Sequence, residues 1–166
     1  MADAATLIKK HQGKGVFVDA NLFVLLMVGQ VNPKRIQEFK RTQSFTEDDF
    51  KLLTTLIAWF GAPVITTPHV LSQVSDLTDL SGPEGKIIRR HFKATVETIQ
   101  EKYDTARSLV NHRLFERFGL GDASVAAVCE RNVVVLTADL QLQIALVASG
   151  LDAINFNHVR SLGWRV

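Results

Sequence analysis

Cysteine is almost absent from this sequence: the 166-residue chain contains Cys129 and no other. A single cysteine cannot form a disulfide within the chain, and zinc sites built on paired cysteines are excluded for the same reason. A domain without disulfides fits a reducing compartment best. Cys129 also lies among alanines in a predicted helix, which favours a small buried side chain over a nucleophile.

Long hydrophobic runs are missing as well. The apolar stretch 16–28 is interrupted by Asp19 and Asn21, and it falls short of the roughly 20 residues that a membrane helix needs. Residues 1–15 lack the charged-then-apolar order of a signal peptide. These absences predict a cytoplasmic protein without a membrane segment.

Several nucleotide and metal motifs are absent too. The chain has neither a GxGxxG motif nor a P-loop, so nothing local indicates a dinucleotide or nucleoside-triphosphate site. The histidines, at positions 11, 69, 91, 112 and 158, never stand four residues apart as paired metal ligands on a helix do. His69 begins a predicted helix near the candidate site, but a surface role suits it better. The net charge of +2 permits an RNA partner without indicating one.

Hydrophobic residues, in contrast, make up 46% of the chain, and its length suits one domain with a sizeable core. We expect a single domain over residues 1–166, in which residues 1–14 hold an N-terminal helical extension. The pattern predicts strands at 15–19, 63–68, 133–139 and 151–156. It predicts helices at 3–12, 20–30, 46–61, 69–77, 84–106, 121–132 and 140–150.

Strands and helices alternate along the chain, which predicts βαβ units and therefore an α/β fold with a parallel sheet covered on both faces. Two helices carry clear signals. Thr46 is suited to cap the helix at 46–61, acids fill its first turn, and Gly61 ends it. The long helix at 84–106 has one apolar stripe, made of Ile88, Phe92, Val96, Ile99 and Tyr103.

Two of the predicted strands end in aspartate, Asp19 in the first case and Asp139 in the other. Ligands of a doubly wound parallel sheet bind beyond the carboxyl ends of the strands, so both acids lie where this fold places its site. Asp122 stands at a predicted helix start just before the Asp139 strand. Taken separately, Asp122 suits an N-cap, and Asp19 suits a turn or a helix cap.

Three carboxylates within a few Å of one another would repel by about 4 kcal/mol per pair at intermediate dielectric. A divalent cation removes this repulsion, and an oxygen-only ligand set favours Mg²⁺ or Mn²⁺ over zinc. We therefore predict that Asp19, Asp122 and Asp139 hold such an ion. A site of this kind binds phosphate oxygens and activates water for phosphodiester hydrolysis.

Four segments, VFVDANLFV, TTPHVLSQVSDL, GLGDASVAAV and VVLTADLQLQIAL, resemble the four blocks of PIN domains in order and separation. The resemblance covers residues 15–156. It implies a three-layer α/β/α sandwich with a central parallel sheet, and metal-dependent RNA cleavage, as in the VapC-type toxins of bacterial toxin–antitoxin pairs. By position, the family's first, third and fourth acids are matched by Asp19, Asp122 and Asp139. Asn21 matches the polar residue after the first acid, and Thr137 matches the hydroxyl residue two before the last.

The chain departs from the PIN pattern at the second acid, where Gln73 stands in place of the usual glutamate. Glutamine keeps an oxygen but loses the charge, so metal affinity should fall. Asp76 lies one helical turn along on the same face, where it can replace the missing carboxylate directly or through a water. Asp79 is less well placed, and Ala20 stands where the family often has Ser or Thr.

These departures leave more than one function open. The first hypothesis is an Mg²⁺- or Mn²⁺-dependent endoribonuclease, in which Gln73 and Asp76 orient water or complete the outer shell. The alternative is a catalytically weakened PIN module that binds RNA or a protein partner without cleaving. A receiver-like signalling domain also gathers acids at strand ends, but its chemistry needs a lysine after a later strand, and 151–156 offers none.

Basic residues form groups that can follow an RNA backbone, although solvated surface charge explains them equally well. The first group is Lys34, Arg35, Lys40 and Arg41, and the second is Arg89, Arg90 and Lys93. The apolar helix faces also permit a homodimer, or a groove for an antitoxin helix as the VapC resemblance implies.

Overall fold

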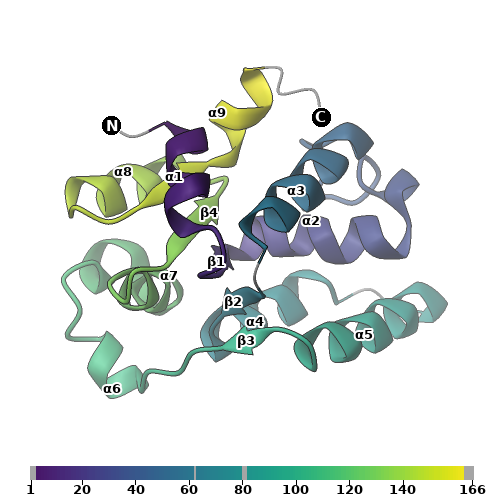
Figure 1. Ribbon diagram of the computed structural model, residues 1–166. Helices are drawn as coiled ribbons and strands as arrows, with labels where there is room; N and C mark the ends of the chain where they lie inside the picture. Colours follow the sequence, from purple (N-terminus) through teal and green to yellow (C-terminus); the bar gives the residue numbers. More distant parts are fainter. Residues whose placement is uncertain (1–2, 62, 80–81, 163–166) are drawn as a thin grey trace.

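The fold is built around a five-stranded parallel sheet. The structure is a computed structural model, and it describes residues 3–61, 63–79 and 82–162. The strands are β1 (Val16–Val18), β2 (Val64–Thr66), β3 (Gln100–Glu101), β4 (Val134–Thr137) and β5 (Ala153–Asn155). They lie in the order β3-β2-β1-β4-β5, and every neighbouring pair is parallel. β1 is therefore the central strand (Figure 1).

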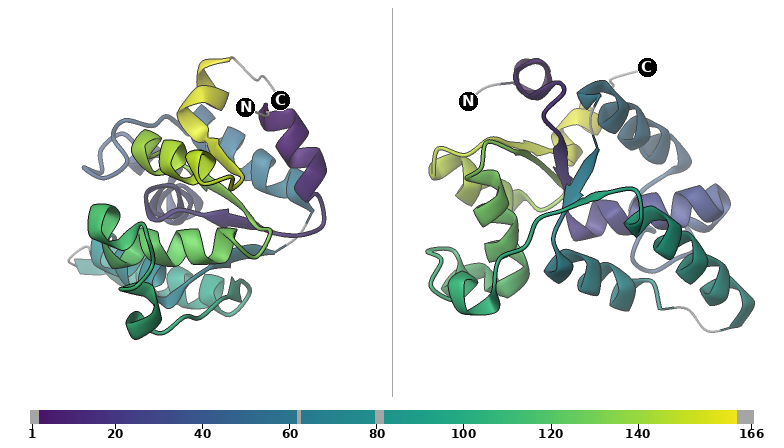
Figure 2. Two further views of the ribbon diagram at one scale, coloured as in Figure 1. Left: turned by 90° about the vertical axis from the view of Figure 1, so that its left-hand side faces the viewer. Right: turned by 60° about the horizontal axis from the view of Figure 1, so that its bottom comes forward.

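Helices flank this sheet, as the two views of Figure 2 show. They are α1 (Ala4–His11), α2 (Ala20–Val31), the 3-10 helix η1 (Pro33–Arg35), α3 (Glu47–Phe60), α4 (Pro68–Leu77), α5 (Gly82–Val96), α6 (Ala106–Leu109), α7 (Phe115–Cys129), α8 (Leu140–Ala148) and α9 (Phe156–Ser161). The predicted α/β/α sandwich with a central parallel sheet is confirmed. Within the described ranges, none of the helices combines the length and the apolar character that a membrane span requires.

The order of the strands reverses at β1. The chain first runs outward from β1 through β2 to β3, and it then returns to the other side of β1 to form β4 and β5. Val18 is in register with Leu136, so β1 and β4 end next to each other. Open α/β sheets bind ligands at this switch point, because the loops that follow the two strands begin side by side there.

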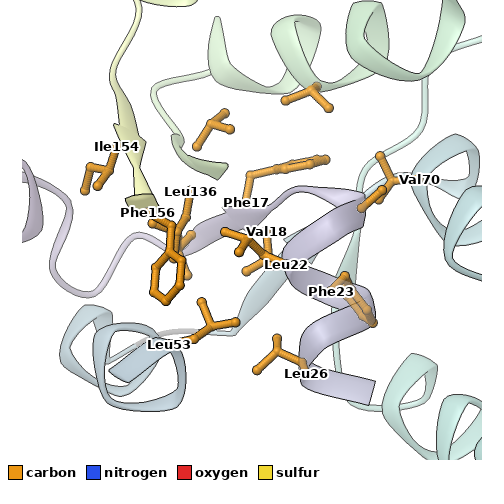
Figure 3. Close-up of a cluster of buried hydrophobic side chains, with 14 of the residues drawn as sticks. Phe17, Val18, Leu22, Phe23, Leu26, Leu53, Val70, Leu136, Ile154 and Phe156 are labelled. Carbon is orange, nitrogen blue, oxygen red and sulfur yellow. The ribbon is translucent and has the colours of Figure 1, made fainter. Parts of the chain in front are cut away.

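The core lies against β1 and the helix that follows it. Figure 3 shows Phe17 and Val18 on opposite sides of β1, with Leu53 and Phe156 on the Val18 side. All of these side chains are almost completely buried. Each one contributes about 1.5–3 kcal/mol through the removal of apolar surface from water. The central strand thus anchors packing on both faces of the sheet.

Helix α2 is buried on every side, because it contacts α3, α4, α5 and β4. Nine of its twelve residues are buried, which is more than one face of a helix. A helix that is apolar all round is stable only when it is enclosed in this way. α2 therefore extends the core beyond the sheet.

The N-terminal helix and the helix after Thr46 follow the predictions. α1 buries Leu7 and half-buries Ile8. Thr46 caps α3 in a capping box with Asp49, and Gly61 ends α3 in the left-handed conformation with φ 60°. These positions were predictable because capping chemistry is local.

The predicted helix at 84–106 is wrong in its second half. α5 ends at Val96, and the chain then turns into β3, which pairs with the edge of β2. Ile99 still packs against the core from this turn, whereas Tyr103 is 65% exposed. β-Branched residues around 95–99 weaken the helix, and the unpaired edge of β2 offers the backbone other partners. Helices α6 and α9 carried no clear sequence signal.

Gly29 is a helical glycine whose surroundings leave no room for a side chain. A Cβ atom at Gly29 would lie 2.4 Å from the Phe50 ring, where α2 meets α3. We expect Gly29→Ala to lower the free energy of unfolding by about 1–3 kcal/mol, because a rigid ring has to move. Gly121→Ala is the matched control: its Cβ would meet the flexible amide end of Gln73, which can turn away. Urea unfolding of both variants tests this, and equal losses would contradict it.

Candidate functional site

Thr137 connects the two acids that follow the central strands. Its hydroxyl donates a hydrogen bond to Asp19 Oδ2 at 2.7 Å and accepts one from the Asp139 backbone N–H at 2.9 Å. The Asp19 N–H also bonds to the Leu136 carbonyl at 3.0 Å, which extends the pairing of β1 with β4. The structure therefore brings Asp19 and Asp139 to the switch point, as the sequence predicted for strand ends.

Both acids also cap the helices that follow them. Asp19 Oδ1 accepts from the Ala20 N–H at 2.7 Å at the start of α2. Asp139 Oδ1 accepts from the Gln141 and Leu142 N–H groups at 2.7 and 3.0 Å at the start of α8. The capping interpretation of Asp19 is thus confirmed. Each carboxylate gains from the positive end of a helix dipole, so part of its charge is compensated locally.

Asp122 does not begin a helix, which corrects the N-cap interpretation. α7 starts at Phe115 and is broken at Gly119, where φ 82° and ψ −173° are angles that essentially only glycine adopts. Asp122 lies in the first turn after this break. Its half-buried side chain makes no hydrogen bond or ion pair with the residues that the structure describes. Of the three acids, Asp122 is therefore the one whose carboxylate is available to bind a ligand.

The three acids lie close enough to affect one another's charge. The pKa of Asp122 is raised to about 7, mainly by burial and further by the carboxylates of Asp19 and Asp139. Burial also raises the pKa of Asp19, against the hydrogen bonds from Thr137 and Ala20, and Asp139 adds to the increase. The negative charge gathered here is therefore only partly compensated.

A second set of contacts fixes α4 against the turn that carries Asp122. The Ser124 hydroxyl donates to the Gly121 carbonyl at 2.6 Å, so Thr67 donates to Ser124 in the 2.8 Å contact between their oxygens. The side chain of Gln73 lies directly against Gly121, at a distance that leaves no room for a Cβ atom. The amide that replaces the expected glutamate is thus a neighbour of Asp122.

Asp76 and Asn21 are not brought into these contacts. Both side chains are exposed, and neither makes a hydrogen bond or ion pair with the described residues. Asp76 is not among the groups that raise the pKa of Asp122. Their supporting roles therefore stay predictions.

Sequence reasoning missed two asparagines, Asn155 and Asn157, near the loop that carries Asp139. Asn155 ends β5 in register with Thr137, and its Nδ2 atom is buried without a hydrogen-bond partner in the described residues. Asn157 Nδ2 donates to the Ala138 carbonyl at 3.0 Å, which holds the loop that carries Asp139. The rule that polar residues at strand ends meet at one edge would have identified Asn155.

Arg117 was missed as well, although it is a cation at the rim of this site. Its guanidinium donates to Gln141 Oε1 at 3.1 Å and lies 4.9 Å from the Phe118 ring. Gln141 in turn donates its backbone N–H to Asp139. No sequence pattern connects Arg117 with α8, because the contact depends on the break in α7.

The basic residues predicted to bind RNA lie elsewhere. The first group follows the far end of α2, whose twelve residues span about 18 Å from the Asp19 end. Arg35 bridges Glu38 and Glu84 at 2.7 Å each, and Arg89 pairs with Asp79 at 2.8 Å. The remaining members are exposed, namely Lys34, Lys40, Arg41, Arg90 and Lys93. Their contact with RNA stays a prediction.

The chemistry of the three acids suits a hard divalent cation, because they offer only oxygen and carry unbalanced negative charge. Their present orientation does not form a ligand cluster: among the described residues, no group of three or more His, Cys, Asp or Glu side chains is arranged to hold a metal ion. Mg²⁺ or Mn²⁺ binding thus stays a prediction and requires these side chains to reorient.

Comparisons with known proteins define the fold alone. No family model matches the chain, and no curated protein matches it. It is similar to the crystal structure of PAE2754 from Pyrobaculum aerophilum, with a TM-score of 0.50 and 16% sequence identity, over 87% of this chain and 92% of that one. At this identity, the similarity supports the α/β architecture and carries no function.

The raised pKa of Asp122 should make stability depend on pH. Between pH 3.8, the ordinary value, and about 7, the folded state holds a proton that the unfolded state releases. The free energy of unfolding therefore falls as pH rises through this window. Asp122→Asn removes this loss of stability. Without divalent ions, the free energy of unfolding of the variant minus that of the wild type should therefore increase by about 1–2 kcal/mol from pH 4 to 7, after solvent screening is allowed for.

Urea unfolding across this pH range measures the difference. Asp48→Asn is the control, because Asp48 is an exposed acid on α3. A constant difference between the Asp122→Asn variant and the wild type would contradict the electrostatic account.

Proposed function

We propose that this chain is a PIN-like endoribonuclease that hydrolyses RNA phosphodiester bonds with Mg²⁺ or Mn²⁺. The observation that carries the proposal is the junction at Thr137, which joins Asp19 and Asp139 at the switch point of the sheet. Asp122 adds a third acid whose pKa is raised by burial and by the other two carboxylates. Uncompensated oxygen ligands at this place in an α/β fold suit metal-assisted phosphoryl chemistry.

In this proposal, Asp19, Asp122 and Asp139 hold the cation. A bound Mg²⁺ or Mn²⁺ supplies a Lewis acid for the phosphate and lowers the pKa of a coordinated water. Thr137 fixes the orientation of Asp19 and the start of the Asp139 loop. Gln73 lies beside Gly121, where its amide can hydrogen-bond a water next to Asp122. Asp76 and Asn21 would act only from the outer edge.

The approach of RNA to this acidic site requires positive charge near the rim. Arg117 supplies it, because its guanidinium is held by the neutral side chain of Gln141 and makes no ion pair with a carboxylate in the described part of the chain. Its charge is therefore available for a backbone phosphate. The predicted groups at Lys34–Arg41 and at Arg89–Arg90 would contact more distant parts of the RNA.

The same proposal places the protein in the cytoplasm, as the toxin of a toxin–antitoxin pair. Its partners would be an RNA substrate and an antitoxin protein, and the apolar helix faces would serve a homodimer. The support for this role is the sequence resemblance to VapC-type toxins alone.

A specific observation favours the second candidate, a weakened PIN module that binds RNA or a protein without cutting. Both oxygens of Asp19 accept hydrogen bonds within the protein, and the position of the second acid is held by Gln73. Those hydrogen bonds leave fewer lone pairs of Asp19 for a metal, and the site would lack the negative charge of a fourth carboxylate. Weak metal affinity distinguishes this candidate from the first.

Cleavage of single-stranded RNA in Mn²⁺ tests the main proposal. We expect Asp19→Asn to abolish cleavage, since the variant keeps the cap on α2 but loses a charged ligand. Asp48→Asn on α3 should cleave as the wild type does, and circular dichroism confirms folding of each variant. Persistent cleavage by Asp19→Asn rejects the site, whereas RNA binding without cleavage by the wild type favours the weakened module.

Gln73→Glu tests the assigned role of Gln73. The variant adds a carboxylate beside Gly121, so we expect Mn²⁺ to bind about tenfold more tightly or better in calorimetric titration. The rate of RNA cleavage should rise together with the Mn²⁺ affinity if the missing charge is what weakens the module. Asp76→Asn, one turn along α4, should leave Mn²⁺ affinity within about twofold of the wild type if only the outer edge is affected. Unchanged Mn²⁺ affinity in Gln73→Glu would refute this account.

A further inference from the structure

A cavity of about 420 Å³ lies beside the edge strand β3, and it takes its polar side chains from three separate parts of the chain. Lys14 comes from the segment before β1, and Arg131 from the turn between α7 and β4. Gln100 and Lys102 come from β3 and the residue after it. None of the acids at the switch point lines this cavity. We call it the cation pocket.

The parallel register explains why these side chains converge. Gln100 is in register with Ile65, which in turn pairs with Phe17. Lys102 continues this pairing, since its N–H bonds to the Thr66 carbonyl at 2.8 Å. Side chains two residues apart share a face of a strand, so Gln100 and Lys102 point to one face of the sheet, where they line the cavity with Ile65, while Glu101 points to the other face.

Glycine at position 15 is needed to form one wall of the pocket. Its φ of 96° lies in the left-handed region, and a Cβ atom there would approach Ile65 Cδ1 to 2.5 Å. The chain can therefore pass close over Ile65 and bring Lys14 to the rim. Across the pocket, Asn132 adopts φ 63° in the turn that presents Arg131.

Positive charge in the cation pocket is largely uncompensated. Lys14 and Lys102 make no ion pair with the residues that the structure describes. Arg131 pairs with Asp104 at 2.5 Å, which fixes the guanidinium. Glu130, the neighbouring acid, is turned toward Arg113 at 3.6 Å. Two unpaired lysines and one oriented guanidinium in a concave site attract an anion, because a cleft lined by one sign of charge concentrates ions of the opposite sign.

We infer that the cation pocket binds the phosphate group of a nucleotide. Lysines and arginine supply charge-assisted hydrogen bonds to phosphate oxygens. The amides of Gln100 and Asn132 can bond a base or sugar, and Ile65 and Val133 form an apolar floor. The volume lies within the range of about 300–1,000 Å³ that is typical of small-molecule sites. The phosphate can belong to a free nucleotide or to the end of an RNA strand.

Calorimetric titration with AMP, in the absence of divalent metal, tests this inference. We expect AMP to bind and adenosine not to bind. Lys14→Gln and Lys102→Gln should each weaken AMP binding by about tenfold or more, because each loses a charge-assisted contact. Lys86→Gln is the control, since it removes the same charge from an exposed position on α5. Lys14 is exposed, so its substitution keeps the test valid even if Lys102→Gln does not fold.

An RNA oligonucleotide with a 5′-phosphate, compared with its 5′-hydroxyl form, identifies the source of the phosphate. Tighter binding of the phosphorylated strand than of AMP assigns the site to an RNA end, and tighter binding of AMP assigns it to a free nucleotide. No binding of AMP or of the phosphorylated strand at millimolar concentration, or an equal loss in Lys86→Gln, overturns the inference. The Asp19→Asn variant should bind AMP normally, so this outcome is independent of the proposed nuclease.

Discussion

The hydrogen-bond pair at Thr137 is the constraint on which the acidic site depends. A buried carboxylate is unfavourable unless donors surround it, and Asp19 is 95% buried at the end of the central strand. The Thr137 hydroxyl supplies one donor and the first N–H of α2 supplies another. Because the same hydroxyl also accepts from Asp139, the loops after β1 and β4 are fixed relative to each other. The geometry of the site is thus set by the sheet.

Local compensation is greater for two of the three acids than for the third. Asp19 and Asp139 each cap a helix, whereas Asp122 has only the field of the first turn after Gly119. The unfavourable charge therefore concentrates on Asp122. The cation pocket beside β3 has the opposite imbalance, because its lysines have no acidic partner among the described residues. One small domain thus carries two separated regions of unbalanced charge, and each is suited to a ligand of opposite sign.

The sequence was sufficient for the α/β class, the strand that leads into Asp19 and the caps of α3, because these depend on hydrophobic pattern and local chemistry. It was not sufficient for β3, whose residues Gln100 and Glu101 have no strand character and pair only because β2 has a free edge. The helical residues before Gly119 were missed, because the sequence predicted this helix only from residue 121, and a glycine does not reveal its φ. Contacts such as that of Arg117 with Gln141 follow from the break and could not be inferred without it.

The position of β1 in the sheet has a consequence for synthesis on the ribosome. β1 is made early, yet its partner β4 follows more than 100 residues later, and the bond between Asp19 and Thr137 spans 118 positions. At about 5–20 residues per second, the ribosome takes roughly 6–24 s to deliver that partner. The largely apolar α2 has to remain uncovered on that side during this interval. The nascent chain therefore exposes an apolar helix well before the sheet can close around it.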